Sequence, residues 1–396
     1  MQIYADNAAT TRLSDTALNA MLPYLQGEYG NPSSLHSVGQ RAQEALTEAR
    51  ARIAARLGCQ PTEVIFTSGG SEADNQAIRS VAAFGKMKGK THIISTAFEH
   101  HAVLHTLEAL EKEGFTVTLL DVHEDGMVSA QQVEDAITPE TCLVTVMYAN
   151  NEIGTVQPIA EIGDVCRRHG VLFHTDAVQA VGHLPVNVAE QNIDMLSLSA
   201  HKFHGPKGIG VLYARRGVPI FPLIHGGAQE RNRRGGTENI PAIVGTAAAL
   251  DEACDHLEED TAKLTALRER LIAGLSNIPH SVLNGHREHR LPGTVNFCFE
   301  GIEGESLLLL LDDKGVYASS GSACTSGSLD PSHVLLAIGR PHEIAHGSLR
   351  LSLSPDTTEE EVDYMVEAVT DVVAYLRSIS PVWRNLEAGI QEFIIQ

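Results

Sequence analysis

The most informative stretch of the sequence is Asp194-Met-Leu-Ser-Leu-Ser-Ala-His-Lys-Phe-His-Gly-Pro-Lys-Gly-Ile-Gly210. An apolar strand ends at Ser199, a polar turn carries Lys202, and a glycine-rich segment leads into another strand. Small neighbours allow close packing around the lysine, and partial desolvation lowers the pKa of an amine, which favours the neutral nucleophile. A surface lysine beside an ordinary turn is the alternative, but the flanking Ser-x-His and Gly-x-Gly sequences favour a lysine that forms a Schiff base.

Around this stretch, from about residue 60 to 215, short β-rich runs alternate with helical patterns. The expected strands are 63–67, 91–95, 142–148, 171–175, 195–199 and 210–213, and the expected helices are 71–84, 102–113 and 159–169. This alternation predicts an α/β fold with a mainly parallel sheet that helices cover on both faces.

The chain changes character after about residue 250. We expect a long charged helix over 251–275, a strand over 293–299, a leucine-rich helix, a Gly/Ser loop over 319–328, a strand over 348–353 and a helix over 358–379. These elements indicate a second, smaller α+β domain.

Composition excludes several classes of protein. The 396 residues are 43% hydrophobic and 20% charged, which is typical of a globular chain. Its 29 Lys and Arg against 50 Asp and Glu give a net charge of −21, which disfavours nucleic acid as a partner. No apolar run reaches the roughly 18 residues of a membrane span, and the N-terminus lacks the pattern of a signal peptide, so we expect a cytoplasmic protein without a membrane partner.

The segment Thr67-Ser-Gly-Gly-Ser-Glu72 lies between an expected strand and an expected helix. Gly70 and its neighbour let the backbone approach an anion, and Ser71 opens a helix whose N–H groups favour phosphate. Neither the GxGxxG nor the GxxxxGK[ST] pattern is present, so the sequence gives no support for a dinucleotide or P-loop site. An ordinary capped loop is the alternative.

Three further polar residues follow expected strands. Asp176 ends one strand and suits the ring nitrogen of pyridoxal phosphate, which needs a carboxylate, although a helix cap or surface acid is equally compatible. His100 could stack on a flat ring, and Asn151 could hold a ring oxygen or a carboxylate. With Ser71 and Lys202 these residues share the carboxyl edge of the sheet, where ligands of such folds bind. That convergence is stronger than any single motif.

Other chemistry-bearing residues lie apart from this group. Cys324, in a Gly/Ser-rich loop without apolar neighbours, is expected to be an exposed thiol with a reactive role, the alternative being an exposed cysteine without any role. Arg350 alternates with apolar residues in a strand, where it could clamp a carboxylate or pair with an acid. The basic segment 231–237 could face a phosphate or solvent. His101 and His105 have helical metal-ligand spacing, but no third ligand is evident, so we expect no metal.

Together these residues resemble the cysteine desulfurases of the NifS/IscS type, in the class V aminotransferase group of pyridoxal phosphate enzymes. The likeness runs from Tyr4-Ala-Asp-Asn-Ala-Ala-Thr-Thr11 to the C-terminal tail. Its most specific parts are the Lys202 stretch and Ser319-Ser-Gly-Ser-Ala-Cys-Thr-Ser-Gly-Ser-Leu-Asp-Pro-Ser-His333. The sequence Cys-Thr-Ser-Gly-Ser resembles the nitrogen-fixation members of the family more than the housekeeping members.

The resemblance implies the aspartate-aminotransferase-like fold type I, with a seven-stranded sheet in the large domain. We place the large domain at 16–255 and the small domain at 1–15 and 256–396. L-cysteine would become L-alanine, and its sulfur would pass to Cys324 as a persulfide for iron–sulfur cluster assembly. A selenocysteine lyase, a class V aminotransferase and a non-enzymatic sulfur carrier are the alternatives.

The resemblance also assigns roles to residues. Lys202 would bind pyridoxal phosphate covalently, Asp176 would pair with its ring nitrogen, His100 would stack on the ring and Gln179 would contact the ring hydroxyl. The phosphate would be held by Gly70, Ser71, Ser199, His201 and, in the neighbouring subunit of a homodimer, Thr237. Asn151 and Arg350 would bind the substrate carboxylate.

The C-terminal tail contains several large apolar residues, namely Trp383, Ile390, Phe393 and Ile394. They make the tail a candidate docking site for a scaffold protein, or a segment that packs on its own small domain.

Overall fold

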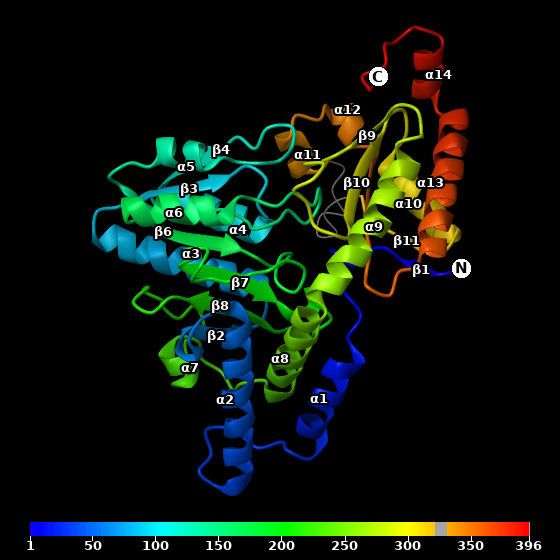
Figure 1. Cartoon of the computed structure of the whole chain (residues 1–396). Coiled ribbons are helices and arrows are strands. Elements are labelled where there is room, and N and C mark those ends of the chain that lie inside the picture. Colours follow the sequence, from blue (N-terminus) through cyan, green and yellow to red (C-terminus); the bar gives the residue numbers. More distant parts are fainter. Residues whose placement is uncertain (321–330, 396) are drawn as a thin grey trace.

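The computed structural model describes residues 1–320 and 331–395. Its largest sheet has seven strands in the order β2-β8-β7-β6-β5-β3-β4 (Figure 1). The strands are β2 (Val64–Thr67), β3 (His92–Thr96), β4 (Thr116–Leu120), β5 (Thr141–Thr145), β6 (Leu172–Asp176), β7 (Met195–Ser199) and β8 (Gly210–Ala214). Only β8 runs antiparallel to its neighbours in this sheet as described. The expected α/β fold with a mainly parallel sheet is confirmed.

Alternate side chains of this sheet enter two hydrophobic clusters, as the period of two in a strand requires. Phe66, Ile94 and Val144 point to one face, where they pack with α2 (Ser37–Leu57), α6 (Ile159–His169) and α8 (Ile240–Asp255). Ile65 and Ile93 point to the other face, which α3 (Gly70–Met87) and α4 (His101–Lys112) cover. Helices on both faces leave the strand ends as the place where polar groups can meet.

A separate hydrophobic cluster lies around a three-stranded antiparallel sheet in the order β12-β10-β9. Its strands are β9 (Ser281–Leu283), β10 (Thr294–Phe299) and β12 (Ser348–Ser352), and its helices are α9 (Leu257–Leu275), α10 (Gly304–Asp313) and α13 (Glu359–Ile379). The parallel pair β1 (Ile3–Tyr4) and β11 (Val316–Tyr317) brings the N-terminus to this cluster. The domain boundaries given above stay a prediction.

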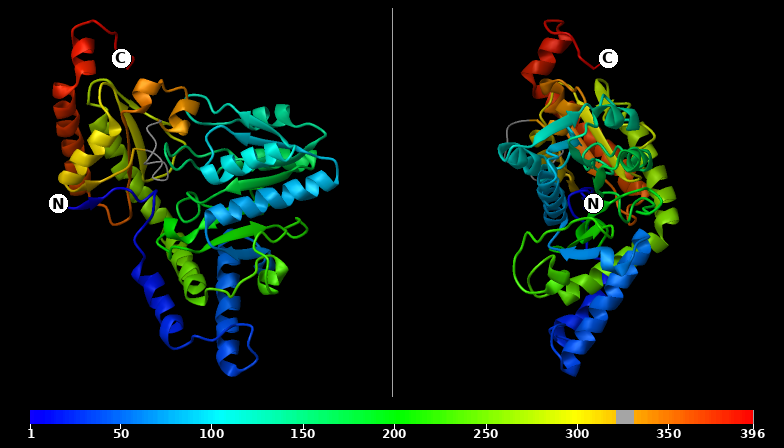
Figure 2. Two further views of the ribbon diagram at one scale, coloured as in Figure 1. Left: turned by 180° about the vertical axis from the view of Figure 1, so that it is seen from behind. Right: turned by 90° about the vertical axis from the view of Figure 1, so that its left-hand side faces the viewer.

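The remaining elements connect or extend these two parts. They are α1 (Asp15–Gln26), α5 (Ala130–Ala136), α7 (Gln229–Asn232), α11 (His333–Ala337), α12 (His342–Ala345), α14 (Pro381–Glu387) and the 3₁₀ turns η1 (Pro61–Glu63) and η2 (Ala200–Lys202). Both views of Figure 2 show α1 and the first turns of α2 (blue) extending beyond the two sheets, while the rest of α2 packs on the large sheet. No helix in the described ranges is long and apolar enough to cross a membrane.

The expected single helix over 251–275 is wrong. The structure has two helices there, α8 and α9, and His256 between them leaves the helical conformation with φ −99° and ψ 2°. Leu250 packs in the cluster of the large sheet and Leu264 in that of the small one, so the break lets one chain serve both clusters. Strand β4 at the sheet edge and the helices α1 and α2 were also not expected from the sequence.

Candidate active site

A cavity of about 220 Å³ opens at the carboxyl ends of the parallel strands of the large sheet. The predicted residues that line it are Gly70, Ser71, His100, Asn151, Asp176, Gln179, Ser199, His201, Lys202 and Arg350. Thr237 is exposed and does not line this cavity, and Cys324 lies outside the described residues. The structure therefore brings together in one place most of the residues predicted from separate parts of the sequence.

Lys202 is the last residue of the η2 turn that follows β7. Its Nζ donates hydrogen bonds to the carbonyl oxygens of Ala8 at 2.6 Å and Ala9 at 2.9 Å. His183 Nε2 donates to the Lys202 carbonyl at 2.9 Å, which fixes the turn from the other side. The lysine is thus held by the N-terminal segment, which the sequence analysis used only as part of the resemblance.

Two buried acids line the cavity together. Asp176 ends β6, its carboxylate accepts a hydrogen bond from Val178 N at 2.9 Å, and burial raises the pKa of Asp176 to about 6. Asp74, from α3, was not predicted; burial and then the charge of Asp176 raise its pKa well above the usual range. Asp74 Oδ1 has no hydrogen-bond partner among the described residues. Such a pair favours a cationic group in the cavity, and a protonated pyridine nitrogen is one.

The N-terminus of α3 forms another wall of the cavity. Gly69 has φ 156°, which favours glycine, and a Cβ on Gly70 would lie 2.6 Å from Val178 Cγ2. Ser199 and His201 approach from the end of β7, and burial lowers the pKa of His201 to about 4, so this imidazole is neutral at neutral pH. A close backbone and a helix N-terminus favour an anion such as phosphate here.

His100 caps α4 with its side chain. Its Nδ1 accepts a hydrogen bond from Ala102 N at 3.1 Å, which leaves the ring proton on Nε2. Burial, and then the charge of Lys202, lowers the pKa of His100 to about 4. A neutral, fixed imidazole at this wall is compatible with stacking on a flat ring.

Arg350 lies on β12, and its side chain is only 1% exposed. Nη2 donates to Asp6 Oδ1 at 2.7 Å, and Nη1 donates to the Asn151 carbonyl at 3.0 Å. The sequence left a carboxylate clamp and an ion pair open. The structure contains the ion pair, with Asp6, and Arg350 also lines the cavity, so the carboxylate clamp stays a prediction.

Gln179 Nε2 donates to the Ala8 carbonyl at 2.9 Å, so this side chain also contacts the N-terminal segment. The basic segment 231–237 is tied back by an ion pair of 2.9 Å between Arg234 and Glu72. Thr237 at its end is exposed, and its predicted contact with a neighbouring subunit stays a prediction.

The His101 ring stacks on His105, with ring centroids 4.9 Å apart, and meets the His333 ring at a tilt of 40°, with centroids 4.5 Å apart. Neither ring nitrogen of His101 has a hydrogen-bond partner within the described ranges. Even so, no group of three or more His, Cys, Asp or Glu side chains among those residues could hold a metal ion.

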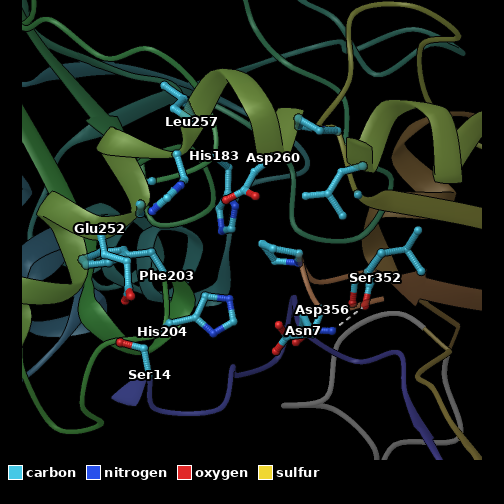
Figure 3. Close-up of a pocket in the computed structure, with 18 of the residues that line it drawn as sticks. Asn7, Ser14, His183, Phe203, His204, Glu252, Leu257, Asp260, Ser352 and Asp356 are labelled. Carbon is cyan, nitrogen blue, oxygen red and sulfur yellow. Dashed lines mark hydrogen bonds between the residues drawn. The ribbon is translucent and has the colours of Figure 1, made fainter. Parts of the chain in front are cut away.

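A second cavity of about 330 Å³ lies behind the Lys202 turn, between α8, α9 and the N-terminal segment (Figure 3). His183, His204, Glu252 and Asp260 are among its lining residues. Ala8 and Gln179 line both cavities, so a thin wall separates them. Among the predicted site residues that the structure describes, only Gln179 lines this second cavity.

The C-terminal tail packs on the small sheet through part of its apolar residues. The Phe393 ring stacks on His280 at 3.7 Å and meets Trp383 at 5.3 Å, while Arg377 lies 4.0 Å above the Trp383 ring. Ile390 is 72% exposed. Trp383 and Phe393 thus pack against the rest of the chain, as the alternative prediction for the tail states.

Comparison with known proteins agrees with this geometry. The family model described as Aminotransferase class-V matches residues 3–365. A protein named cysteine desulfurase IscS from Clostridium botulinum (strain Hall) is 53% identical over 394 residues, which are 99% of each chain. A solved structure described as a NifS-like protein has a TM-score of 0.89 at 40% identity and covers 95% of this chain and 100% of that one. Another, SspA in complex with cysteine, has a TM-score of 0.79 at 40% identity and covers 90% and 99%.

These similarities extend over most of the chain. The seven-stranded sheet and the small antiparallel sheet agree with the fold type I transferase architecture that the resemblance implied. Because the family model spans the strands, the lysine turn and the arginine strand alike, the chain belongs to the aminotransferase class-V family.

Proposed function

We propose that this chain is a pyridoxal phosphate-dependent cysteine desulfurase. It converts L-cysteine to L-alanine and transfers the sulfur to Cys324 as a persulfide. The observation that carries this proposal is the single buried cavity that contains Lys202, Asp176 and Arg350. The full-length similarity to a protein named cysteine desulfurase supports the reaction, and the relative described in complex with cysteine supports the substrate.

The residues present fit the cofactor. The acid pair with an unpartnered oxygen suits the ring nitrogen, and the N-terminus of α3 suits the phosphate. Lys202 would hold the cofactor covalently, Asp176 its nitrogen, His100 its ring face and Gln179 its hydroxyl. Gly70, Ser71, Ser199 and His201 would hold the phosphate, with Thr237 from a second copy of the chain. When bound, the cofactor supplies an electron sink for charge that develops at the substrate Cα.

The residues of the chain do the remaining work. Arg350 and Asn151 bind the substrate carboxylate, and the Lys202 amine, once released, takes the proton from Cα. The Cys324 thiolate attacks the substrate sulfur: an S–S bond forms, the C–S bond breaks, and its electron pair remains on the carbon skeleton. That carbon takes up a proton, so one L-cysteine and one thiol give one L-alanine and one persulfide.

We propose the same partners as the resemblance implied. The enzyme is a cytoplasmic homodimer that passes sulfur to an iron–sulfur scaffold protein, and the exposed Ile390 and Ile394 remain for docking. We keep the domain boundaries 16–255 and 1–15 with 256–396, because the cluster of the small sheet, within the described ranges, draws only on residues 3–5 and 264–376, while Val334 and Leu335 cross over to the cluster of the large sheet. The sequence around Cys324 favours a role in nitrogen fixation.

The test is incubation of cofactor-loaded protein with L-cysteine, with L-alanine and protein-bound persulfide measured. Wild type yields both, Lys202→Ala yields neither, and Cys324→Ala keeps the cofactor absorbance but forms no persulfide. An aminotransferase would hardly respond to Cys324→Ala, and a protein that takes up no cofactor would contradict the proposal. A selenocysteine lyase would act on selenocysteine and leave L-cysteine unchanged.

A further inference from the structure

We propose that Asp6 is a positioning residue that holds the Arg350 guanidinium in place for the carboxylate of the amino acid substrate. The inference rests on the proposed function, because it concerns how that site recognises its substrate. Its starting point is the ion pair between the two residues, which lie 344 positions apart in the sequence.

Asp6 and Asn151 fix Arg350 at two points. The guanidinium donates from Nη2 to Asp6 Oδ1 and from Nη1 to the Asn151 carbonyl, and its Nε has no partner in the described part of the chain. These two bonds, made by two of the five N–H groups, set the orientation of the planar guanidinium. A carboxylate that enters the cavity therefore meets donors that are already oriented.

Asp6 is itself fixed by the strand that carries Arg350. Ser352, two positions further along β12, donates its N–H to the Ala5 carbonyl at 2.7 Å and accepts Ala8 N at its Oγ at 2.9 Å. Its carbonyl accepts Asn7 Nδ2 at 2.8 Å, the bond drawn in Figure 3. These bonds hold Asp6 and the arginine in register.

We call residues 6–11 the N-terminal strap. Beyond Asp6, the carbonyl oxygens of Ala8 and Ala9 accept hydrogen bonds from the Lys202 amine. The Ala8 carbonyl also accepts one from the Gln179 amide. One short segment therefore connects the arginine of the small sheet with the lysine of the large sheet. The second cavity, lined in part by Asn7 and Ala8, lies on the other side of the strap. Because side chains do not fill that side, we expect these hydrogen bonds to hold the strap in place.

This role predicts an effect on binding rather than on chemistry. A hydrogen bond to a charged group contributes about 1.5–3 kcal/mol, so Asp6→Ala should raise KM for L-cysteine about tenfold or more. The value of kcat should stay within about threefold, because the arginine holds a carboxylate that does not react. Asp6→Asn keeps an acceptor oxygen without the charge and should raise KM only about threefold.

The experiment separates carboxylate recognition from general damage. Affinities of the cofactor-loaded protein for L-alanine and for ethylamine, which differ only in the carboxylate, are measured from the change in visible absorbance. Asp363→Ala is the matched control, because Asp363 of α13 pairs with Arg270 of α9 at 2.6 Å on the exposed surface of these helices. Melting temperature and cofactor content are recorded for every variant.

The inference requires weaker L-alanine binding in Asp6→Ala, an intermediate value in Asp6→Asn, and unchanged ethylamine binding in both. Equal changes for the two ligands, or none for either, would overturn it. If Asp6→Ala does not fold, Asp6→Asn decides by the same criterion. These titrations need no turnover, so a wild type that binds L-alanine but releases none from L-cysteine would contradict the proposed function and leave the role of Asp6 to be judged separately.

Discussion

The two sides of the candidate active site are built in different ways. The cofactor side consists of residues at the ends of neighbouring strands and at the start of α3, all within the large sheet and its helices. The substrate side consists of Arg350 from the small sheet and the N-terminal strap, joined by a contact between positions 344 apart. One side is set by local strand–helix geometry, and the other by how distant segments pack.

This difference has a physical consequence. On the cofactor side, buried acids and a helix N-terminus keep their place because the sheet is rigid and covered on both faces. On the substrate side, hydrogen bonds at the edge of two cavities hold the strap. We therefore expect changes on the cofactor side to affect cofactor binding and catalysis strongly, and changes on the substrate side to act more weakly and through substrate affinity.

The largest effect should come from Lys202→Ala. Under the proposed function the variant would lose both the covalent attachment of the cofactor and the base for the Cα proton, so activity should fall by more than about 10³-fold. Alanine formation from L-cysteine measures it. A variant that retains a tenth of wild-type activity would show that another residue performs these steps, and the comparison between the two sides would fail.

Asp176→Asn tests the buried acid pair through stability. Burial raises the pKa of Asp176 from an ordinary 3.8 to about 6. The folded state therefore holds the proton more tightly than the unfolded state, so this group's contribution to stability is present below pH 3.8 and lost as the pH rises through 6. Cofactor-free Asp176→Asn should be more stable than wild type at pH 7.5 by about 2–3 kcal/mol.

The measurement for this variant is urea unfolding of cofactor-free protein at pH 7.5 and pH 4. The advantage of Asp176→Asn should shrink to a small fraction at pH 4, because folded Asp176 then holds its proton and the unfolded carboxyl is within about a pH unit of its own pKa. The same variant should bind pyridoxal phosphate more weakly, because an amide cannot balance a pyridinium charge. A stability difference that does not change with pH would contradict the assignment of the shift to Asp176.

The sequence predicted which residues meet in the cavity at the strand ends because each follows a strand pattern, while their roles toward a cofactor stay predictions. Asp74 was not predicted as a site residue, because an acid one turn into a helix is typically exposed to solvent. Asp6 could not be found, because nothing near it in the sequence indicates Arg350. The break at His256 was missed for a related reason: the helical pattern is continuous, and only the presence of two hydrophobic clusters requires the chain to bend.

Gly70→Ala should have a smaller effect. The added Cβ would lie 2.6 Å from Val178 Cγ2, so the start of α3 must shift, and the affinity for pyridoxal phosphate should fall about tenfold. Absorbance titration of the cofactor measures this affinity. Gly27→Ala is the matched control, since a Cβ there makes ordinary contact at 3.5 Å with the Pro23 carbonyl. Equal losses in the two variants would show that the cradle at Gly70 is not specific.

The smallest effect should come from Asn7→Ala in the N-terminal strap. The side chain donates to the carbonyls of Tyr4 at 3.1 Å and Ser352 at 2.8 Å, and we expect a loss of about 1 kcal/mol in the free energy of unfolding. Urea unfolding measures it, with Asn277→Ala as control because its bond to Ala273 is exposed. No loss beyond that of the control would show that packing, and not these bonds, holds the strap.

The central claim is that the cavity binds pyridoxal phosphate covalently through the Lys202 amine. Borohydride reduction of protein loaded with pyridoxal phosphate, followed by peptide mass spectrometry, tests it directly. The account predicts a phosphopyridoxyl group on Lys202 and its absence after the Lys202→Ala change. A group attached to another lysine, or no attached group at all, would contradict the account.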